Sequence, residues 1–329
     1  MRSNRGLRRV LGDPAPPPDG PVSVGYGLGA ATALVTAVAF ISAKPVLEYL
    51  DPLSFSVSQF GIASVFAFLW LLRRRELGQI RDLTHGQWTF LFVIALLFLG
   101  AVYTMWIGLS SIPATAAALL NRLEVLVTVF LGMALLGDRF TRREGWGAFL
   151  AVLGMIVLRY DAPPSFSAGF WMMVLSSTLF GIIEVLVKTR VHAIPPRVFT
   201  FVRNTLVFVL FLVAAVWRVA MQEGPWWVGV ADWPGIRRGL PLIAVTALVG
   251  PVLARTMFMY CLRYLEISRA TLIQQAQPVF VAVLSSILLR ALPSRREWVG
   301  GLLIVAGCLF LVQWSRTLSW RRRSGEVAP

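Results

Sequence analysis

The sequence predicts an all-α membrane protein in which ten transmembrane helices form two inverted five-helix repeats. Three observations lead to this prediction: an apolar composition, ten apolar segments of helical length, and a pattern that occurs twice along the chain. Of the 329 residues, 57% are hydrophobic and 14% are charged, and the mean hydropathy is +0.71. A soluble domain has roughly 45–50% apolar and about 25% charged residues, so this chain departs from that class in both respects.

Each of the ten apolar segments is close to the length of a membrane-spanning helix. The hydrocarbon core of a bilayer is about 30 Å thick, which requires about 20 apolar residues of helix. One such segment could be a buried helix of a soluble protein, but ten in succession exclude that class. The segments are approximately residues 25–46, 53–72, 88–109, 113–136, 145–159, 168–188, 198–219, 239–262, 270–291 and 298–315.

An internal repeat relates the two halves of the chain. The stretch Ala117–Leu158 returns 153 residues later as Ala270–Leu311, with 13 of 42 positions identical in an ungapped comparison. Apolar helices match at some positions by composition alone. The shared hinge, Arg142–Glu144 against Arg295–Glu297, has two glycines after it in the same register, and this match indicates a duplication.

The second copy is predicted to be inserted upside down. Equivalent segments lie five spans apart, and because five is odd, they cross the membrane in opposite directions. Inverted repeats of this kind occur in secondary transporters, whose binding site lies between the halves near the bilayer midplane.

Positive charge predicts the orientation. With the N-terminus inside, the predicted inner connections and tails contain 20 Lys and Arg residues and the outer connections contain 7. This bias predicts a multi-pass protein of a bacterial cytoplasmic membrane with both termini in the cytoplasm. We therefore divide the chain into a disordered cytoplasmic tail (1–24), a first repeat (25–160), a second repeat (161–315) and a basic cytoplasmic tail (316–329).

Charged residues inside the predicted spans mark a candidate site. A charge at the centre of a membrane helix costs about 2.5–3.5 kcal/mol, so side chains of this kind are expected to pair with one another or to face a water-filled cavity. Structural ion pairs without substrate contact remain an alternative for each of them. The candidates for charge pairing or coupling are Lys44, Glu184, Arg203 and Arg255, and the fourth span contributes Arg122 and Glu124.

Polar residues recur at one depth in both halves. The repeat pairs three residues of the fourth span with three of the ninth, namely Asn121, Arg122 and Glu124 with Gln274, Gln275 and Gln277. Pro278 follows four residues after Gln274 and is expected to loosen the helical hydrogen bonding there. We interpret these residues as a substrate site suited to an anionic or zwitterionic group. Tyr103 and Trp106 in the third span could stack on the substrate, although ordinary packing explains them equally well.

Other classes of site find no support in the sequence. The two histidines and two cysteines are scattered, which predicts no metal site and no cofactor. The arginines sit between apolar segments rather than on an aromatic-interleaved face, so no nucleic-acid partner is expected. The expected partners are membrane lipids and a small-molecule substrate. Glycines on the fifth and tenth spans permit close helix packing, either within the chain or in a homodimer.

These features resemble the drug/metabolite transporter superfamily, in its ten-span group with two EamA-type repeats. The resemblance covers roughly residues 25–315 and is carried by L-L-G-D-R-F-T-R-R-E-x-x-G (135–147), Gln277–Phe280, Lys44 and the Asp51–Pro52 turn. It implies that spans one to four and six to nine enclose a central cavity, with spans five and ten peripheral. It also implies alternating access and the movement of small metabolites, commonly amino acids and often outward.

The sequence therefore predicts a secondary active transporter, an exporter of a small polar metabolite, and not an enzyme. No glycine-rich nucleotide loop is present, so an ion gradient would supply the energy, with Glu124 or Glu184 as the candidate proton carrier. A translocase for lipid-linked groups is an alternative. A membrane-embedded transferase is a weaker one, because it needs a cluster of acidic residues to hold a divalent metal.

Overall fold

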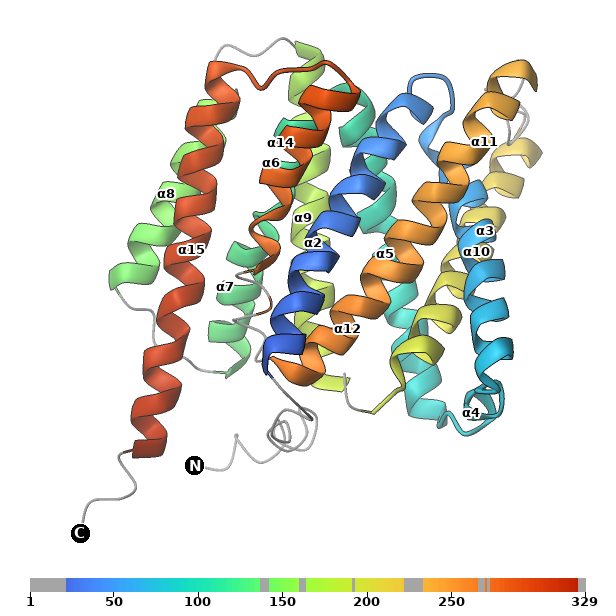
Figure 1. The fold of residues 1–329 in the computed structure, drawn as a ribbon, viewed down its shortest axis with the longest axis horizontal. Helices are drawn as coiled ribbons and strands as arrows, with labels where there is room; N and C mark the ends of the chain where they lie inside the picture. Colours follow the sequence, from blue (N-terminus) through green and yellow to red (C-terminus); the bar gives the residue numbers. More distant parts are fainter. Residues whose placement is uncertain are drawn as a thin grey trace.

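The computed structural model describes residues 22–136, 142–159, 164–190, 193–221, 233–265, 270 and 273–324, and every regular element within them is helical. The long helices run side by side, alternately up and down, as Figure 1 shows. The first turn of α2 and the last turn of α15 lie at the same edge of the molecule. The elements are α2 (Val22–Val46), α3 (Pro52–Arg74), α4 (Gly78–Arg81), α5 (His85–Ser111), α6 (Ala114–Asn121), α7 (Glu124–Leu136), α8 (Arg142–Arg159), α9 (Pro164–Arg190), α10 (Pro196–Ala220), α11 (Trp233–Ala247), η1 (Leu248–Ala254), α12 (Arg255–Tyr264), α14 (Gln277–Leu288) and α15 (Arg295–Ser324).

Each of the ten predicted segments falls on helix, but three of them are interrupted. In the described part of the chain, six helices are long and apolar enough to cross a membrane. The fourth predicted span is divided into α6 and α7, the ninth is broken just before α14, and the eighth contains a π-helical turn, η1. At the ends of the chain, residues 1–21 of the predicted N-terminal tail lie outside the described residues. α15 continues to Ser324, so much of the predicted C-terminal tail is helical.

The outer surface of this helical bundle is apolar. Large aliphatic side chains such as Val65, Val213, Ile287 and Leu302 are between 58% and 68% exposed. A soluble monomer rarely exposes apolar patches on this scale, whereas a membrane protein presents such side chains to lipid. Most of the polar side chains that the sequence analysis selected are instead buried or partly buried inside the bundle.

The breaks in the fourth and ninth spans lie at repeat-equivalent positions. The chain turns at Arg122 and Leu123 in the first copy and at Gln275 and Ala276 in the second. Both turns are tightened by backbone bonds to the residue three before, such as Arg122 N to Leu119 O at 3.1 Å and Ala276 N to Ile273 O at 3.0 Å. The predicted duplication therefore extends to an irregularity of the backbone.

Pro278 explains the break in the second copy, as the sequence predicted. A proline has no backbone N–H, so it cannot bond the carbonyl of the residue four before it, which is Gln274. That carbonyl instead accepts a hydrogen bond from Arg122, which belongs to the first copy. The loss of one helical bond thus creates a contact between the two halves.

A second proline produces the π-helical turn. Pro251 lies inside η1, and the N–H of Arg255 donates to the carbonyl of Gly250, five residues before it. Gly250 allows η1 to lie close to α2, because a Cβ there would be 3.3 Å from the Cβ of Ala39. The bulge leaves the carbonyl of Pro251 to accept from the side chains of Arg203 and Asn204.

Two pairs of repeat-equivalent helices pack against each other in antiparallel directions. α3 and α10 are joined at one end by the ion pair of Asp51 and Arg218, with an Oδ1–Nη1 distance of 3.0 Å, and at the other by Glu76 and Arg197. Asp51 also caps α3, because its carboxylate accepts from the N–H groups of Leu53 and Ser54. The second such pair is α8 and α15, at the opposite side of the bundle in Figure 1.

Glycines set the distance between α8 and α15. A Cβ on Gly154 would lie 2.5 Å from the carbonyl oxygen of Gly300, and one on Gly307 would lie 2.5 Å from that of Gly147. These approaches are possible only without side chains. The glycines of the predicted fifth and tenth spans are therefore used within the chain, which leaves the homodimer hypothesis without their support.

Candidate functional site

A central cavity of about 220 Å³ lies between the two halves. Its walls come from all eight spans that the family resemblance implied, and within the described residues α8 and α15 contribute none of its lining. This volume is below the roughly 300–1,000 Å³ of sites for drug-sized ligands, so it suits a small molecule. The polar lining residues are Thr32, Thr36, Gln59, Asn121, Arg122, Glu124, Thr128, Glu184, Arg203, Arg255, Gln274 and Gln277, and the aromatic ones are Phe40, Phe60, Phe98, Trp106, Phe180 and Phe258.

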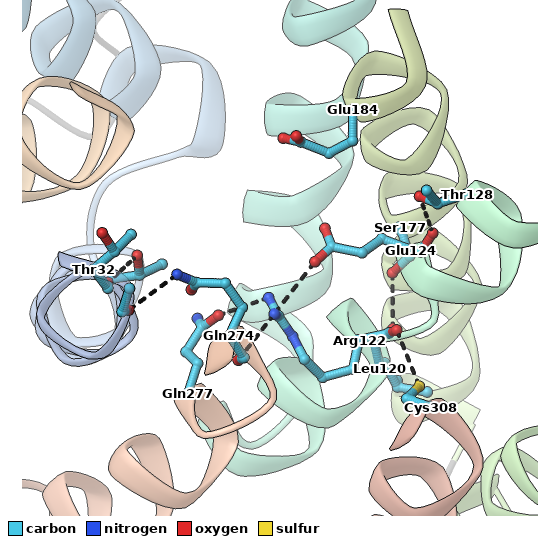
Figure 2. A network of polar contacts seen from close by, with 12 residues as sticks. Thr32, Leu120, Arg122, Glu124, Thr128, Ser177, Glu184, Gln274, Gln277 and Cys308 are labelled. Atoms are coloured by element: carbon cyan, nitrogen blue, oxygen red, sulfur yellow. Dashed lines mark hydrogen bonds and ion pairs between the residues drawn. The ribbon is translucent and has the colours of Figure 1, made fainter. Parts of the chain in front are cut away.

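Arg122 joins the two halves at the breaks in their helices. Its Nη1 donates to the carbonyl of Gln274 at 3.2 Å, and its Nη2 donates to Oε1 of Gln277 at 2.6 Å. The same guanidinium forms an ion pair with Glu124, with an N–O distance of 3.3 Å. Figure 2 shows this network, in which Arg122 reaches from the first copy to Gln274 and Gln277 of the second. These contacts bring Arg122 and Glu124 of the first copy beside Gln274 and Gln277 of the second.

Neighbouring helices satisfy other polar groups around the break. Ser177 on α9 donates to the carbonyl of Leu120 at 2.8 Å, and the thiol of Cys308 on α15 lies 3.4 Å from the carbonyl of Arg122. On the other side, Nε2 of Gln274 donates to the carbonyl of Gly29 on α2 at 3.2 Å. Figure 2 shows these contacts around Arg122. They hold the irregular backbone in a region where an unpaired carbonyl would be costly.

Glu184 and Arg255 form a second ion pair, with an Oε1–Nη1 distance of 2.5 Å. Glu184 belongs to α9 and Arg255 to α12, and the cavity lies between these helices. Their side chains are 22% and 12% exposed, whereas Gln59 and Trp106 in the same lining are 2% and 4% exposed. The pair therefore lies toward the mouth of the cavity and the other two residues lie at its inner end.

Arg203 is the most deeply buried charge in the cavity lining, with no exposed surface. Its Nη2 donates to Oδ1 of Asn204 at 2.7 Å and to the carbonyl of Pro251 at 2.9 Å. Its guanidinium carbon lies 4.4 Å from the ring centre of Phe98, which is a cation–π contact. Among the described residues, no carboxylate lies within ion-pair distance of Arg203.

Several buried polar atoms of the lining have no hydrogen-bond partner within the described part of the chain. Buried polar groups are normally bonded, so a cluster of exceptions in one cavity indicates that a ligand or water completes them. The cluster includes both donors and acceptors. Its atoms are Gln59 Oε1, Trp106 Nε1, Asn121 Oδ1, Arg122 Nε, Arg203 Nη1, Arg255 Nε and Nη2, and Gln277 Nε2.

Three of the predicted site residues do not line the cavity: Tyr103, Gln275 and Lys44. Tyr103 is 38% exposed and packs against Phe211 on α10, so the expectation that it lies beside the site is wrong. Gln275 is buried but is not part of the lining. Trp106, by contrast, lines the cavity.

Lys44 has a structural position at the end of α5. Its ammonium donates to the carbonyls of Leu109, Ser110 and Ile112, at 2.6, 3.2 and 3.0 Å. These carbonyls have no helical partners at a C-terminus, and a cation there also interacts favourably with the helix dipole. Lys44 therefore caps α5 rather than lining the cavity.

The sequence analysis did not select several residues of the lining. Gln59 could have been selected from the sequence, because it is the repeat equivalent of Arg203. In the structure it lines the cavity at the inner end and is 2% exposed. Threonines such as Thr32 and Thr128 also face the cavity, but each bonds a carbonyl four residues before it in its own helix. Nothing in the sequence separates a threonine of this kind from an ordinary membrane threonine.

A membrane bundle of two related halves around a central cavity, lined by charged, polar and aromatic side chains, is typical of a membrane transport protein. The chain belongs to the EamA-like transporter family, whose model matches residues 23–160 and again 167–313. Transport across a membrane is the activity of this non-enzymatic family. A comparison with curated proteins finds no match. One crystal structure of a protein is similar, with a TM-score of 0.58 over 90% of this chain and 99% of the other, but at 20% identity this likeness concerns the fold alone.

Proposed function

We propose that the protein is a secondary active transporter that exports a small polar metabolite, such as an amino acid, across the bacterial cytoplasmic membrane. Ten spanning helices, in two inverted five-helix repeats, would provide access to the cavity alternately from each side. The observation that carries this proposal is the cluster of unpartnered donors and acceptors in a buried cavity between the halves. A zwitterion offers the complementary mixture of acceptor and donor groups.

Broken helices at the centre support alternating access. Discontinuous helices in transporters place backbone and side-chain polar groups at the substrate, and here two of them meet through Arg122. Glu184 and Arg255 both belong to the second half, so their ion pair must break only if α9 and α12 move apart from each other within that half.

We infer that the mouth faces the edge at which α2 begins. The first turn of α2 lies against the end of α12, where a Cβ on Gly25 would be 2.6 Å from Leu265. Arg255 is ten residues before Leu265 and 22 residues after Trp233, the start of α11, so it lies in the half of this span that is nearer to that edge. Under the orientation predicted from positive charge, this edge is cytoplasmic. Such a cavity could load a metabolite from the cytoplasm, as export requires. The orientation is tested by fusing a reporter that is active only outside the cytoplasm to the connection at residues 75–84 or to the one at 222–232. Activity is expected only for the second.

Counterflow in proteoliposomes tests transport directly. Purified protein is reconstituted, the vesicles are loaded with one unlabelled compound, and uptake of the labelled compound is measured for amino acids, nucleosides and organic anions. Thr36→Trp would fill part of the cavity and is expected to abolish exchange. Val213→Trp adds the same group at a 61% exposed outer position and should leave exchange intact. Absence of exchange for every compound, with confirmed insertion, would reject the proposed function.

Glu124 and Glu184 are the candidate proton carriers, because both line the cavity and both contact an arginine. Proton coupling requires a carboxyl group that can be loaded on one side and emptied on the other. Glu124→Gln removes this capacity with little change in shape. If transport and its pH dependence are unchanged in Glu124→Gln, Glu124 is not the coupling residue, and Glu184→Gln provides the same test for the second carboxyl.

A further inference from the structure

The charges of the cavity lining do not balance. Three arginines and two glutamates line it, and two of the arginines are paired, Arg122 with Glu124 and Arg255 with Glu184. Among the described residues Arg203 has no carboxylate within ion-pair distance, although the charge of Glu184 acts on it from further away. A buried charge without a counter-ion is strongly unfavourable, because it loses hydration and gains no ion pair. The empty cavity therefore has an excess of one positive charge at its most buried arginine.

Arg203 is held in place on one side of its guanidinium and has an unpartnered nitrogen on the other. Asn204 and the carbonyl of Pro251 accept from Nη2, and Phe98 lies against the guanidinium plane. Nη1 is buried and has no partner in the described part of the chain, although Arg203 belongs to the cavity lining. A guanidinium fixed in this way presents its remaining N–H groups to a ligand with little further loss of conformational entropy.

An aromatic wall adjoins this arginine. The ring of Phe98 makes edge-to-face contacts with Phe60, at 6.0 Å between centres, and with Phe180, at 5.6 Å. All three rings line the cavity. An anionic group at Arg203 would thus have an apolar surface beside it, which suits a molecule with a charged end and an apolar body.

We propose that Arg203 binds a carboxylate of the substrate, and that the substrate is a small organic acid or amino acid whose apolar body lies against Phe60, Phe98 and Phe180. This inference rests on the proposed function. The bound carboxylate supplies the negative charge that the lining lacks, and Nη1 of Arg203 donates to it. A neutral analogue of the same shape leaves the buried charge uncompensated and binds weakly.

Two probes of matched shape test the proposal: 3-phenylpropionate and its neutral amide, 3-phenylpropionamide. Their binding to the full-length purified protein is measured by isothermal titration calorimetry in detergent. The wild type is expected to bind the carboxylate at least tenfold more tightly than the amide, since hydrogen bonds to charged groups contribute about 1.5–3 kcal/mol and tenfold corresponds to about 1.4 kcal/mol. Arg203→Gln should reduce this preference to less than twofold.

Arg197→Gln is the matched control. Arg197 lies six residues before Arg203 on α10, is paired with Glu76 and does not line the cavity, so its loss should preserve the preference. The preference is the deciding measurement, because Arg203→Gln also removes the hydrogen bonds to Asn204 and Pro251 and this loss alone lowers the melting temperature. A purely structural Arg203 would give an unchanged preference.

Equal binding of the two probes by the wild type, or binding of neither, would overturn the inference. So would an undiminished preference in Arg203→Gln. The wild-type comparison requires no variant, so it decides the question even if Arg203→Gln fails to fold. Binding in detergent is independent of counterflow. A clear carboxylate preference without any exchange would therefore reject transport and leave the assignment of Arg203 standing.

Discussion

Replacing Arg122 with glutamine should destabilise the protein more than any other single change in the polar network. The side chain is 4% exposed and makes two hydrogen bonds to the second half and one ion pair within the first. Interhelical hydrogen bonds in membranes contribute roughly 0.6–1.7 kcal/mol each. Arg122→Gln also leaves Glu124 without its ion-pair partner. Because Glu124 is 18% exposed, this should destabilise the protein by less than the roughly 3–5 kcal/mol expected when a fully buried ion pair is broken. We expect a total loss of about 3 kcal/mol.

A double-mutant cycle separates the ion pair from the hydrogen bonds. Glu124→Gln alone should lower the free energy of unfolding by about 2 kcal/mol, because it leaves the buried Arg122 without a counter-ion while Arg122 keeps its bonds to Gln274 and Gln277. The double variant should cost about 1–2 kcal/mol less than the sum of the two single losses, because it leaves no uncompensated charge. The measurement is reversible unfolding in mixed detergent and SDS micelles, followed by circular dichroism. The reasoning fails if Arg122→Gln unfolds within 0.5 kcal/mol of the wild type, as about 0.5 kcal/mol is typical of surface substitutions.

Three further predictions concern other parts of the bundle. Gly154→Ala should destabilise the protein by about 1–3 kcal/mol, because its Cβ would lie 2.5 Å from the Gly300 carbonyl oxygen, about 0.9 Å closer than an ordinary contact of 3.4 Å. Gly27→Ala in α2 has open space around the new Cβ and should stabilise the protein by about 0.5–1 kcal/mol. Unfolding in SDS would measure both, and equal effects would contradict the packing argument. Lys44→Met should lower the melting temperature by removing three hydrogen bonds from the end of α5, with partial recovery in the arginine variant. Glu184→Gln should lower the free energy of unfolding by about 1 kcal/mol, and adding Arg255→Gln should restore this loss. If the losses of the two single variants simply add in the double variant, the ion pair contributes nothing to stability.

Most of the architecture could be predicted from the sequence, because a lipid bilayer permits few kinds of membrane-spanning structure. Apolar length predicts where helices cross, and a repeat separated by an odd number of spans predicts opposite directions. Pro278 predicted a break at Gln274 because its missing N–H acts locally, whatever the surroundings. The first copy has valine at the equivalent position, Val125, yet its helix also breaks. No local rule predicts that break, which depends on contacts with Ser177 and Cys308 from other helices.

For the site, the sequence by itself determined which residues are too polar to face lipid, and at what depth they lie. It did not determine the role of each, because a buried charge can pair, cap a helix or face a cavity, and all three satisfy the same energetic requirement. Only the tertiary structure assigned Lys44 to the end of α5, Arg255 to Glu184, and Tyr103 to an outer position. The stretch around Arg122 was visible as a repeated polar pattern. Its direct contact with the second copy depended on the path of both broken helices, which arises from packing across the whole bundle.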